Sequence, residues 1–262
     1  MLKLLITDQL RLGLAQALIA ALAAMLVVLL ARKREIHLES ETLIAMVRGI
    51  IQIVAVGSIL LLLLRGPRWT SGFLLAGMIV AAAATSARRA KGIPDAFRVS
   101  ACSIAFGAGS VIALMTWLGV IDPAITSLVP VGSMLIANSM NVNGLALNRF
   151  RADVLAHVGE IETALALGAE ARNSVSPYVQ AAFEASLIPA IDSLRSLGIV
   201  WIPGLMAGML LSGARPVYAA IYQFVVLAMI FAASGLTSLV STLLIRDRIF
   251  TAAQQLSLQP GR

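Results

Sequence analysis

Asparagine side chains stand out in the apolar run Ile125–Leu147, where few other residues could contact a solute. If this run is a helix, Met134, Asn138 and Asn141 share one face, and Asn143 lies on another. An amide inside a membrane helix either bonds a neighbouring helix or lines a polar path. Interhelical hydrogen bonding explains each asparagine taken singly. The shared stripe favours a translocation path, to which we assign Met134, Asn138, Asn141 and Asn143.

A second polar pair, Arg48 and Gln52, is four residues apart in the apolar run Leu43–Leu64. Such residues are neighbours on one helix face. Arg48 is near enough to the end of the run for its guanidinium to extend to water. Gln52 is too deep for that. The pair either lines the translocation path or clamps another helix.

Methionines Met206 and Met209 follow Pro203-Gly204. Thioether sulfur suits soft ions such as Cu(I), but methionine is common in membrane helices and packing is the simpler interpretation. Gly204 and Gly208 form a Gly-x-x-x-Gly pattern, which is typical of close helix contacts. We therefore predict that Pro203, Gly204 and Gly208 serve helix packing.

Catalytic and cofactor motifs are absent from the sequence. No serine lies in a G-x-S-x-G context, His37 and His157 have no ligand partners at metal spacing, and Cys102 is the one cysteine. A phosphate-binding loop G-x-x-x-x-G-K-[ST] is also missing. We expect no enzyme activity, no metal site and no cofactor in this chain, so energy from ATP would have to come from another chain.

The elements that must position these residues are membrane helices. Of 262 residues 59% are hydrophobic and 13% charged, and mean hydropathy is +0.91, which predicts an all-α polytopic membrane protein. The net charge of +7 sits in short clusters between apolar runs, and aromatic residues are only 5%, so we expect a lipid bilayer and no nucleic acid as partner.

A membrane core needs about 20 apolar residues per helix. Seven runs are candidates, and the third and sixth are short. The sixth contains Pro203-Gly204, so a broken or tilted helix is the alternative there. The runs are Leu12–Leu30, Leu43–Leu64, Gly72–Ala87, Val99–Val120, Ile125–Leu147, Gly198–Ser212 and Tyr218–Ile245. We predict one transmembrane permease domain over residues 1–262, with a polar cytoplasmic segment, 149–197, inside it.

Basic residues in the loops predict the orientation, because lysine and arginine gather on the cytoplasmic side. One side holds 14 of them and the other 5, with Arg48 inside a span. The 14 are Arg32, Lys33, Arg34, Arg88, Arg89, Lys91, Arg98, Arg149, Arg151, Arg172, Arg195, Arg246, Arg248 and Arg262; the 5 are Lys3, Arg11, Arg65, Arg68 and Arg215. We expect the N-terminus outside, the C-terminus inside, and residence in the cytoplasmic (inner) membrane.

The polar segment has a helical stripe of Ile161, Ala164, Leu165 and Gly168, and Gly168 either ends or bends the first helix. A turn and a second helix, from Tyr178 to about Leu187 and ending before Pro189, complete a helix–turn–helix on the cytoplasmic surface. A helix lying on lipid headgroups is the alternative, but the polar face is acidic, which anionic lipid disfavours.

The spacing E-x-A-x-x-L-G-A over 162–169, followed by Pro189, resembles the coupling segment of ABC importer permeases. In those proteins a short helix docks into a cleft of the ATP-hydrolysing subunit. The resemblance implies ATPase coupling for Glu162, Leu167, Gly168, Ala169 and Pro189, and we include Glu160 with them.

Longer stretches resemble the FetB-type permeases, a family with bacterial iron-efflux permeases and plant aluminium-tolerance permeases. They are RGIIQIVAVGSIL (48–60), PVGSMLIANSMNVNGLAL (130–147) and ASLIPAIDSLRSLGIVWIPGLMAGMLLSGARPVYAAIYQF (185–224). The resemblance implies an ABC transporter permease, a permease homodimer, and a partner ATPase that binds ATP and Mg²⁺. One departure is Ala214-Arg215-Pro216, where the family pattern has an acidic residue before the proline.

The cargo implied by the resemblance is a metal ion such as iron, or a nucleotide sugar or other small solute. Asp122 and Asp192 lie near the ends of the predicted elements, so we expect no carboxylate inside a span, which weakens a simple divalent-cation path. A stand-alone secondary transporter is a second hypothesis, but buried ionisable residues and an inverted repeat are not evident. A membrane-embedded enzyme lacks a nucleophile or metal set.

Overall fold

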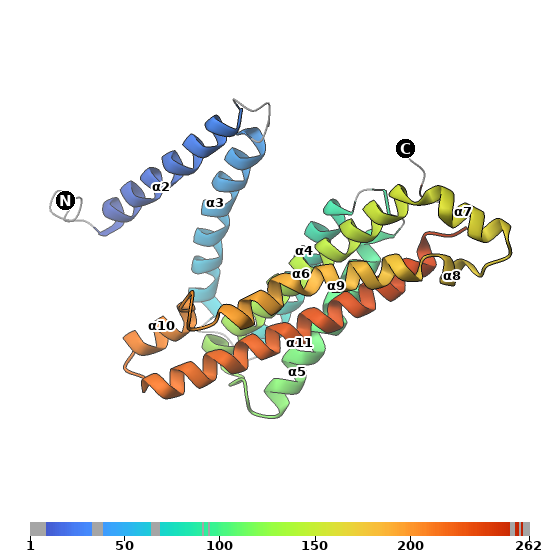
Figure 1. The fold of residues 1–262 in the computed structure, drawn as a ribbon. Coiled ribbons are helices and arrows are strands. Elements are labelled where there is room, and N and C mark those ends of the chain that lie inside the picture. Colours follow the sequence, from blue (N-terminus) through green and yellow to red (C-terminus); the bar gives the residue numbers. More distant parts are fainter. Residues whose placement is uncertain are drawn as a thin grey trace. The chain divides into compact units, whose positions relative to one another are not determined.

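The computed structural model describes residues 9–32, 39–63, 69–90, 92–93, 95–251, 255–256 and 258. His37 and the basic residues Lys3, Lys33, Arg34, Arg65, Arg68, Lys91 and Arg262 lie outside them. Helices dominate, and no β-strand occurs within these ranges (Figure 1). They are α2 (Gln9–Arg32), α3 (Glu39–Leu63), α4 (Thr70–Arg89), α5 (Ala96–Trp117), α6 (Ile125–Ala156), α7 (Val158–Ala166), α8 (Ala171–Ser174), α9 (Ser176–Ser196), α10 (Gly204–Leu211) and α11 (Pro216–Arg248).

The chain divides into two compact units, Met1–Gly66 and Pro67–Arg262. The first unit holds α2 and α3, which pack on each other and expose almost all of their apolar side chains. Apolar helices that expose their whole surface suit a lipid environment. The second unit holds α4 to α11. The single permease domain over 1–262 stays a prediction.

Among the described residues, six helices are long and apolar enough to cross a membrane, which confirms an all-α polytopic membrane protein. They are α2, α3, α4, α5, α6 and α11. The predicted span Gly198–Ser212 is wrong as a spanning helix. Only Gly204–Leu211 is helical there, and 8 residues extend about 12 Å against a membrane core of about 30 Å. Pro203 lacks an N–H donor and Gly198 has φ +75°, so the helix cannot continue back through this stretch.

The second prediction to be corrected is the end of the polar helix before Pro189. One helix, α9, runs through Pro189 to Ser196. It does not lie apart on a surface but packs along α6 and α11, burying Ala182, Ser186 and Leu187 (Figure 1). This burial keeps the helix intact although proline removes one backbone hydrogen bond. α6 is also longer than predicted, ending at Ala156 rather than Leu147.

The core of the second unit depends on a close approach between α5 and α11. A Cβ atom added at Gly107 of α5 would lie 2.6 Å from the backbone nitrogen of Thr237 and 2.8 Å from the carbonyl oxygen of Ala233, both on α11. Only glycine permits this distance between two helix backbones. Around it, Ile104 and Ala108 of α5 are fully buried.

We predict that Gly107→Ala destabilises the chain, because its methyl group meets backbone atoms that cannot rotate away. Overpacking of this kind costs about 1–3 kcal/mol. The control is Gly109→Ala on the same helix, where nothing lies within 4 Å of the added Cβ. Thermal unfolding in detergent should show a lower midpoint for Gly107→Ala only, and equal midpoints for the two variants would contradict the close approach.

Candidate coupling turn and polar cavity

An exposed turn closes α7 at the end of the second unit where α11 finishes (Figure 1). Gly168 has φ +88°, its N–H donates to the carbonyl of Leu165, and the N–H of Ala169 donates to that of Ala164 at 2.9 Å. These two bonds form a Schellman motif, which ends a helix with glycine in the left-handed conformation. Leu167, just before it, is 84% exposed. An apolar side chain is thus presented on a backbone of fixed shape.

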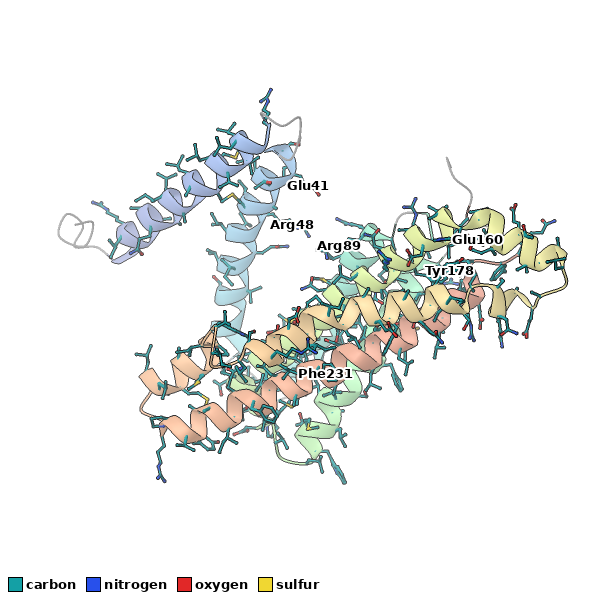
Figure 2. All side chains as sticks on the ribbon, in the orientation of Figure 1. Glu41, Arg48, Arg89, Glu160, Tyr178 and Phe231 are labelled. Carbon is teal, nitrogen blue, oxygen red and sulfur yellow. The ribbon has the colours of Figure 1, made fainter. Side chains whose placement is uncertain are left out.

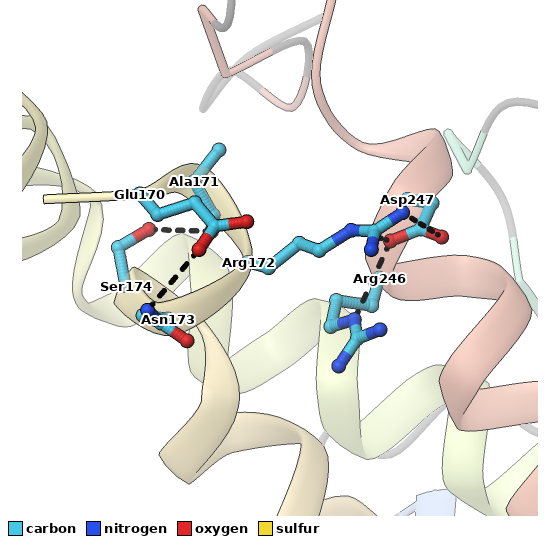
Figure 3. Close-up of polar contacts among 7 residues, drawn as sticks. All are labelled: Glu170, Ala171, Arg172, Asn173, Ser174, Arg246 and Asp247. Atoms are coloured by element: carbon cyan, nitrogen blue, oxygen red, sulfur yellow. Dashed lines mark hydrogen bonds and ion pairs between the residues drawn. The ribbon is translucent and has the colours of Figure 1, made fainter.

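The far side of the turn is tied to the last turn of α11. Arg172 of α8 forms a two-pronged ion pair with Asp247, with nitrogen–oxygen distances of 3.1 and 3.2 Å (Figure 3). Arg246 also contacts Asp247, at 3.4 Å. Bidentate arginine–carboxylate pairs restrict orientation as well as distance. The ion pair therefore fixes α8 against the C-terminal end of α11.

The near side of the turn is held by a ring contact. His157 and Tyr178 stack with their ring centres 5.0 Å apart. The Tyr178 hydroxyl donates to a carboxylate oxygen of Glu160, which lies near it in Figure 2, at 3.3 Å. Burial, and then the negative charge of Glu160, raise the pKa of the Tyr178 hydroxyl above its ordinary value of 10.0. This contact joins the start of α7 to the start of α9.

Four of the six predicted coupling residues lie at the turn, and two do not. Glu162, Leu167, Gly168 and Ala169 are exposed on or beside the turn. Glu160 instead faces Tyr178, and Pro189 lies inside α9, away from the turn. Sequence reasoning missed the Arg172–Asp247 pair, because residues 75 positions apart carry no local signal of their contact.

A cavity of about 150 Å³ lies beside the break between α9 and α10. Met134 and Asn138, predicted to lie on the translocation path, line it together with Ser193 and Gln223. Gln223 is 1% exposed, and its Oε1 accepts a hydrogen bond from the Met206 N–H at 3.2 Å. Its Nε2 finds no hydrogen-bond partner in the described part of the chain. A buried amide donor is therefore available to an acceptor in the cavity.

The other two asparagines lie elsewhere. Asn143 is fully buried and donates to the hydroxyls of Ser86 and Ser100 at 2.7 and 2.9 Å, so it bonds α6 to α4 and α5. This is the interhelical hydrogen bonding that explains an asparagine without a path. Asn141 is exposed.

The remaining predicted sites have few neighbours. Arg48 and Gln52 are exposed on α3 of the first unit. Pro203 precedes α10 directly, and nothing lies within 4 Å of a Cβ added at Gly204 or Gly208. Within the described chain these two glycines therefore make no close helix contact. No group of three histidine, cysteine or acidic residues that could hold a metal occurs among the described residues.

Comparisons with known proteins agree over nearly the whole chain. The family described as Uncharacterised protein family (UPF0014) matches residues 14–250. The UPF0014 membrane protein STAR2 of Oryza sativa subsp. japonica is 32% identical, with 94% of this chain and 86% of that protein covered. Protein ALUMINUM SENSITIVE 3 of Arabidopsis thaliana is 31% identical, covering 93% and 90%. The probable iron export permease protein FetB of Escherichia coli (strain K12) is 31% identical, covering 90% and 93%. No solved structure matches.

The contact between Glu160 and Tyr178 predicts a change in titration. Glu160→Gln removes one of the causes that raise the Tyr178 pKa, so the hydroxyl should ionise at lower pH. Because the folded-state pKa is raised, Tyr178 weakens folding only as pH rises above 10.0, and the variant should reduce that loss. Ultraviolet difference titration against Tyr178→Phe measures the pKa. Glu162→Gln, exposed on the same helix, should leave it unchanged, and an unshifted pKa in Glu160→Gln would contradict the contact.

Proposed function

The chain belongs to the UPF0014 family of membrane proteins, and on this premise we propose that it is the permease subunit of an ABC transporter that exports a metal ion such as iron. The family includes membrane permeases, and one relative bears the name of a probable iron export permease. The similarity extends over 90% of this chain and 93% of that relative, which supports the same role for this chain.

The observation that carries the proposal is the exposed turn 167–170. Leu167 presents an apolar side chain to solvent on a backbone fixed by the Gly168 motif. Leu167 and Gly168 also belong to the spacing E-x-A-x-x-L-G-A over 162–169, which resembles the segment that docks on the ATPase in ABC importer permeases. Glu162 and Glu170 are exposed beside them.

In the proposed mechanism a separate ATPase subunit binds ATP and Mg²⁺ and receives this turn in a cleft. Closure of two ATPase subunits displaces the turns of two permease copies. Because α7 follows α6 directly and α8 is bonded to α11 through Arg172, the displacement acts on helices that continue into the membrane. We place the N-terminus outside and the C-terminus inside, in the cytoplasmic membrane, which requires a seventh crossing between α6 and α11 in addition to the six long apolar helices.

Two cavities border Gln223, one of about 150 Å³ and one of about 330 Å³. Liquid water occupies about 30 Å³ per molecule, so either cavity holds an ion with part of its hydration shell. Their size does not choose between an ion and a larger solute. We favour a metal ion over the nucleotide-sugar alternative because one relative bears the name of a probable iron export permease.

The test uses the complex of this chain with its ATPase subunit, co-purified and reconstituted in lipid. Leu167→Asp should weaken ATPase binding by about tenfold or more, which corresponds to about 1.4 kcal/mol, and should lower ATP hydrolysis accordingly. Ala152→Asp is the control, because it adds the same charge at an exposed position of α6 away from the turn.

Unchanged assembly and hydrolysis in Leu167→Asp would refute the coupling role of the turn. Failure of any ATPase to co-purify with the unaltered chain would favour a transporter that works alone.

A further inference from the structure

The exposed face of α9 is charged. Glu184, Ile188, Asp192 and Arg195 recur at helical spacing on the face opposite to the packed one. The side chains of Asp192 and Arg195 are 63% and 78% exposed, and their nearest charged atoms are 4.0 Å apart. Whether this face meets lipid or water depends on the depth of α9 in the membrane.

The inner edge of the membrane can be placed on α4. This helix has 20 residues, the length that crosses a membrane core, and it ends at Arg88 and Arg89. Near that end Ser86 is bonded to Asn143, which is also bonded to Ser100 of α5. These three side chains therefore mark one level close to the inner edge.

The depth of Asp192 follows from contacts along α5, α11 and α9. Gly107 lies about 10 Å outward of Ser100 at about 1.5 Å per residue, and it faces Ala233–Thr237 of α11. Ser238, about 4 Å back toward the inner end, shares a 2.7 Å hydrogen bond with Ser186 of α9. Asp192 is six residues further outward, about 9 Å. The total is about 15 Å outward of the level of Ser86 and Ser100, or about 19 Å from the end of α4 at Arg89, which lies well inside a core about 30 Å thick.

A charged pair with these exposures cannot face hydrocarbon at the middle of a membrane. The segment 197–203 after α9 leads to the same conclusion, since non-helical backbone at membrane depth occurs only inside protein or beside water. We propose that α9 crosses the membrane as a charged helix, that its exposed face lines a water-filled path, and that Asp192 binds the cation that passes along it. This proposal departs from the expectation that no carboxylate lies inside a span.

The cation assignment rests on the proposed export of a metal ion and on the charge of the face. Glu184 and Asp192 outnumber Arg195, so the face is negative in one chain and twice as negative in a dimer. Carboxylate oxygens suit divalent ions such as Mn²⁺ and Fe²⁺. At 4.0 Å, Arg195 is a weak partner for Asp192, and an arriving cation can replace it.

The test is water access and its change with Mn²⁺, measured in membranes that contain the full chain. In a Cys102→Ser background, Ile188→Cys places a thiol one turn from Asp192, where the native side chain is 55% exposed. Phe106→Cys is the control, on the outer face of α5 at the same depth and 56% exposed. A membrane-impermeant methanethiosulfonate reagent reacts only with thiolates that water reaches.

We expect Ile188→Cys to react at least about tenfold faster than Phe106→Cys, because only an ionised thiol reacts. Mn²⁺ should slow this reaction about threefold or more, and adding Asp192→Asn should abolish the slowing while Glu184→Gln keeps it. An unreactive Ile188→Cys would overturn the water-filled path. A reactive thiol that Mn²⁺ does not protect would overturn the cation role of Asp192. Labelling needs no nucleotide, so failure of the ATPase coupling would leave these results unaffected.

Discussion

The membrane core offers no hydrogen bonds to exposed polar groups, and this constraint explains most of the arrangement of the second unit. Some buried polar side chains are paired inside the bundle, as Asn143 is with Ser86 and Ser100, and Ser186 with Ser238. Others, such as the hydroxyls of Ser103, Ser139 and Ser234, have no hydrogen-bond partner among the described residues. The close approach of α5 and α11 at Gly107 brings two helix backbones together in the same bundle. The same constraint makes the exposed charges of α9 informative, because they have no such partners within the bundle.

The coupling turn and the charged face of α9 belong to one continuous stretch of chain. α7 and α8 form the turn, and α9 leaves it directly to run along α6 and α11. Two side-chain contacts hold the turn to its surroundings, one through Tyr178 and one through Asp247. In the proposed transporter, a displacement of Leu167 would therefore reach Asp192 through the turn, α8 and α9.

Sequence reasoning identified what depends on local pattern. Apolar runs of sufficient length predicted the membrane helices, and the spacing before Gly168 predicted where α7 ends, because left-handed glycine terminates helices. Sequence reasoning failed where tertiary packing determines whether a helix continues. Pro189, Asp192 and Arg195 resemble a surface segment in sequence, yet packing of Ala182 and Ser186 against neighbouring helices carries α9 through the proline. Gln223 was missed because one glutamine in an apolar run gives no sign that its amide reaches a cavity.

The central claim, that the turn at Leu167 is where an ATPase subunit docks, can be tested most directly by photo-crosslinking. A benzophenone amino acid would replace Leu167, and a matched one would replace Leu211, which is 90% exposed at the end of α10. On illumination of the reconstituted complex, the account predicts a covalent product between the probe at 167 and the ATPase subunit, and none from 211. Absence of that product at 167 in an assembled complex that hydrolyses ATP would contradict it.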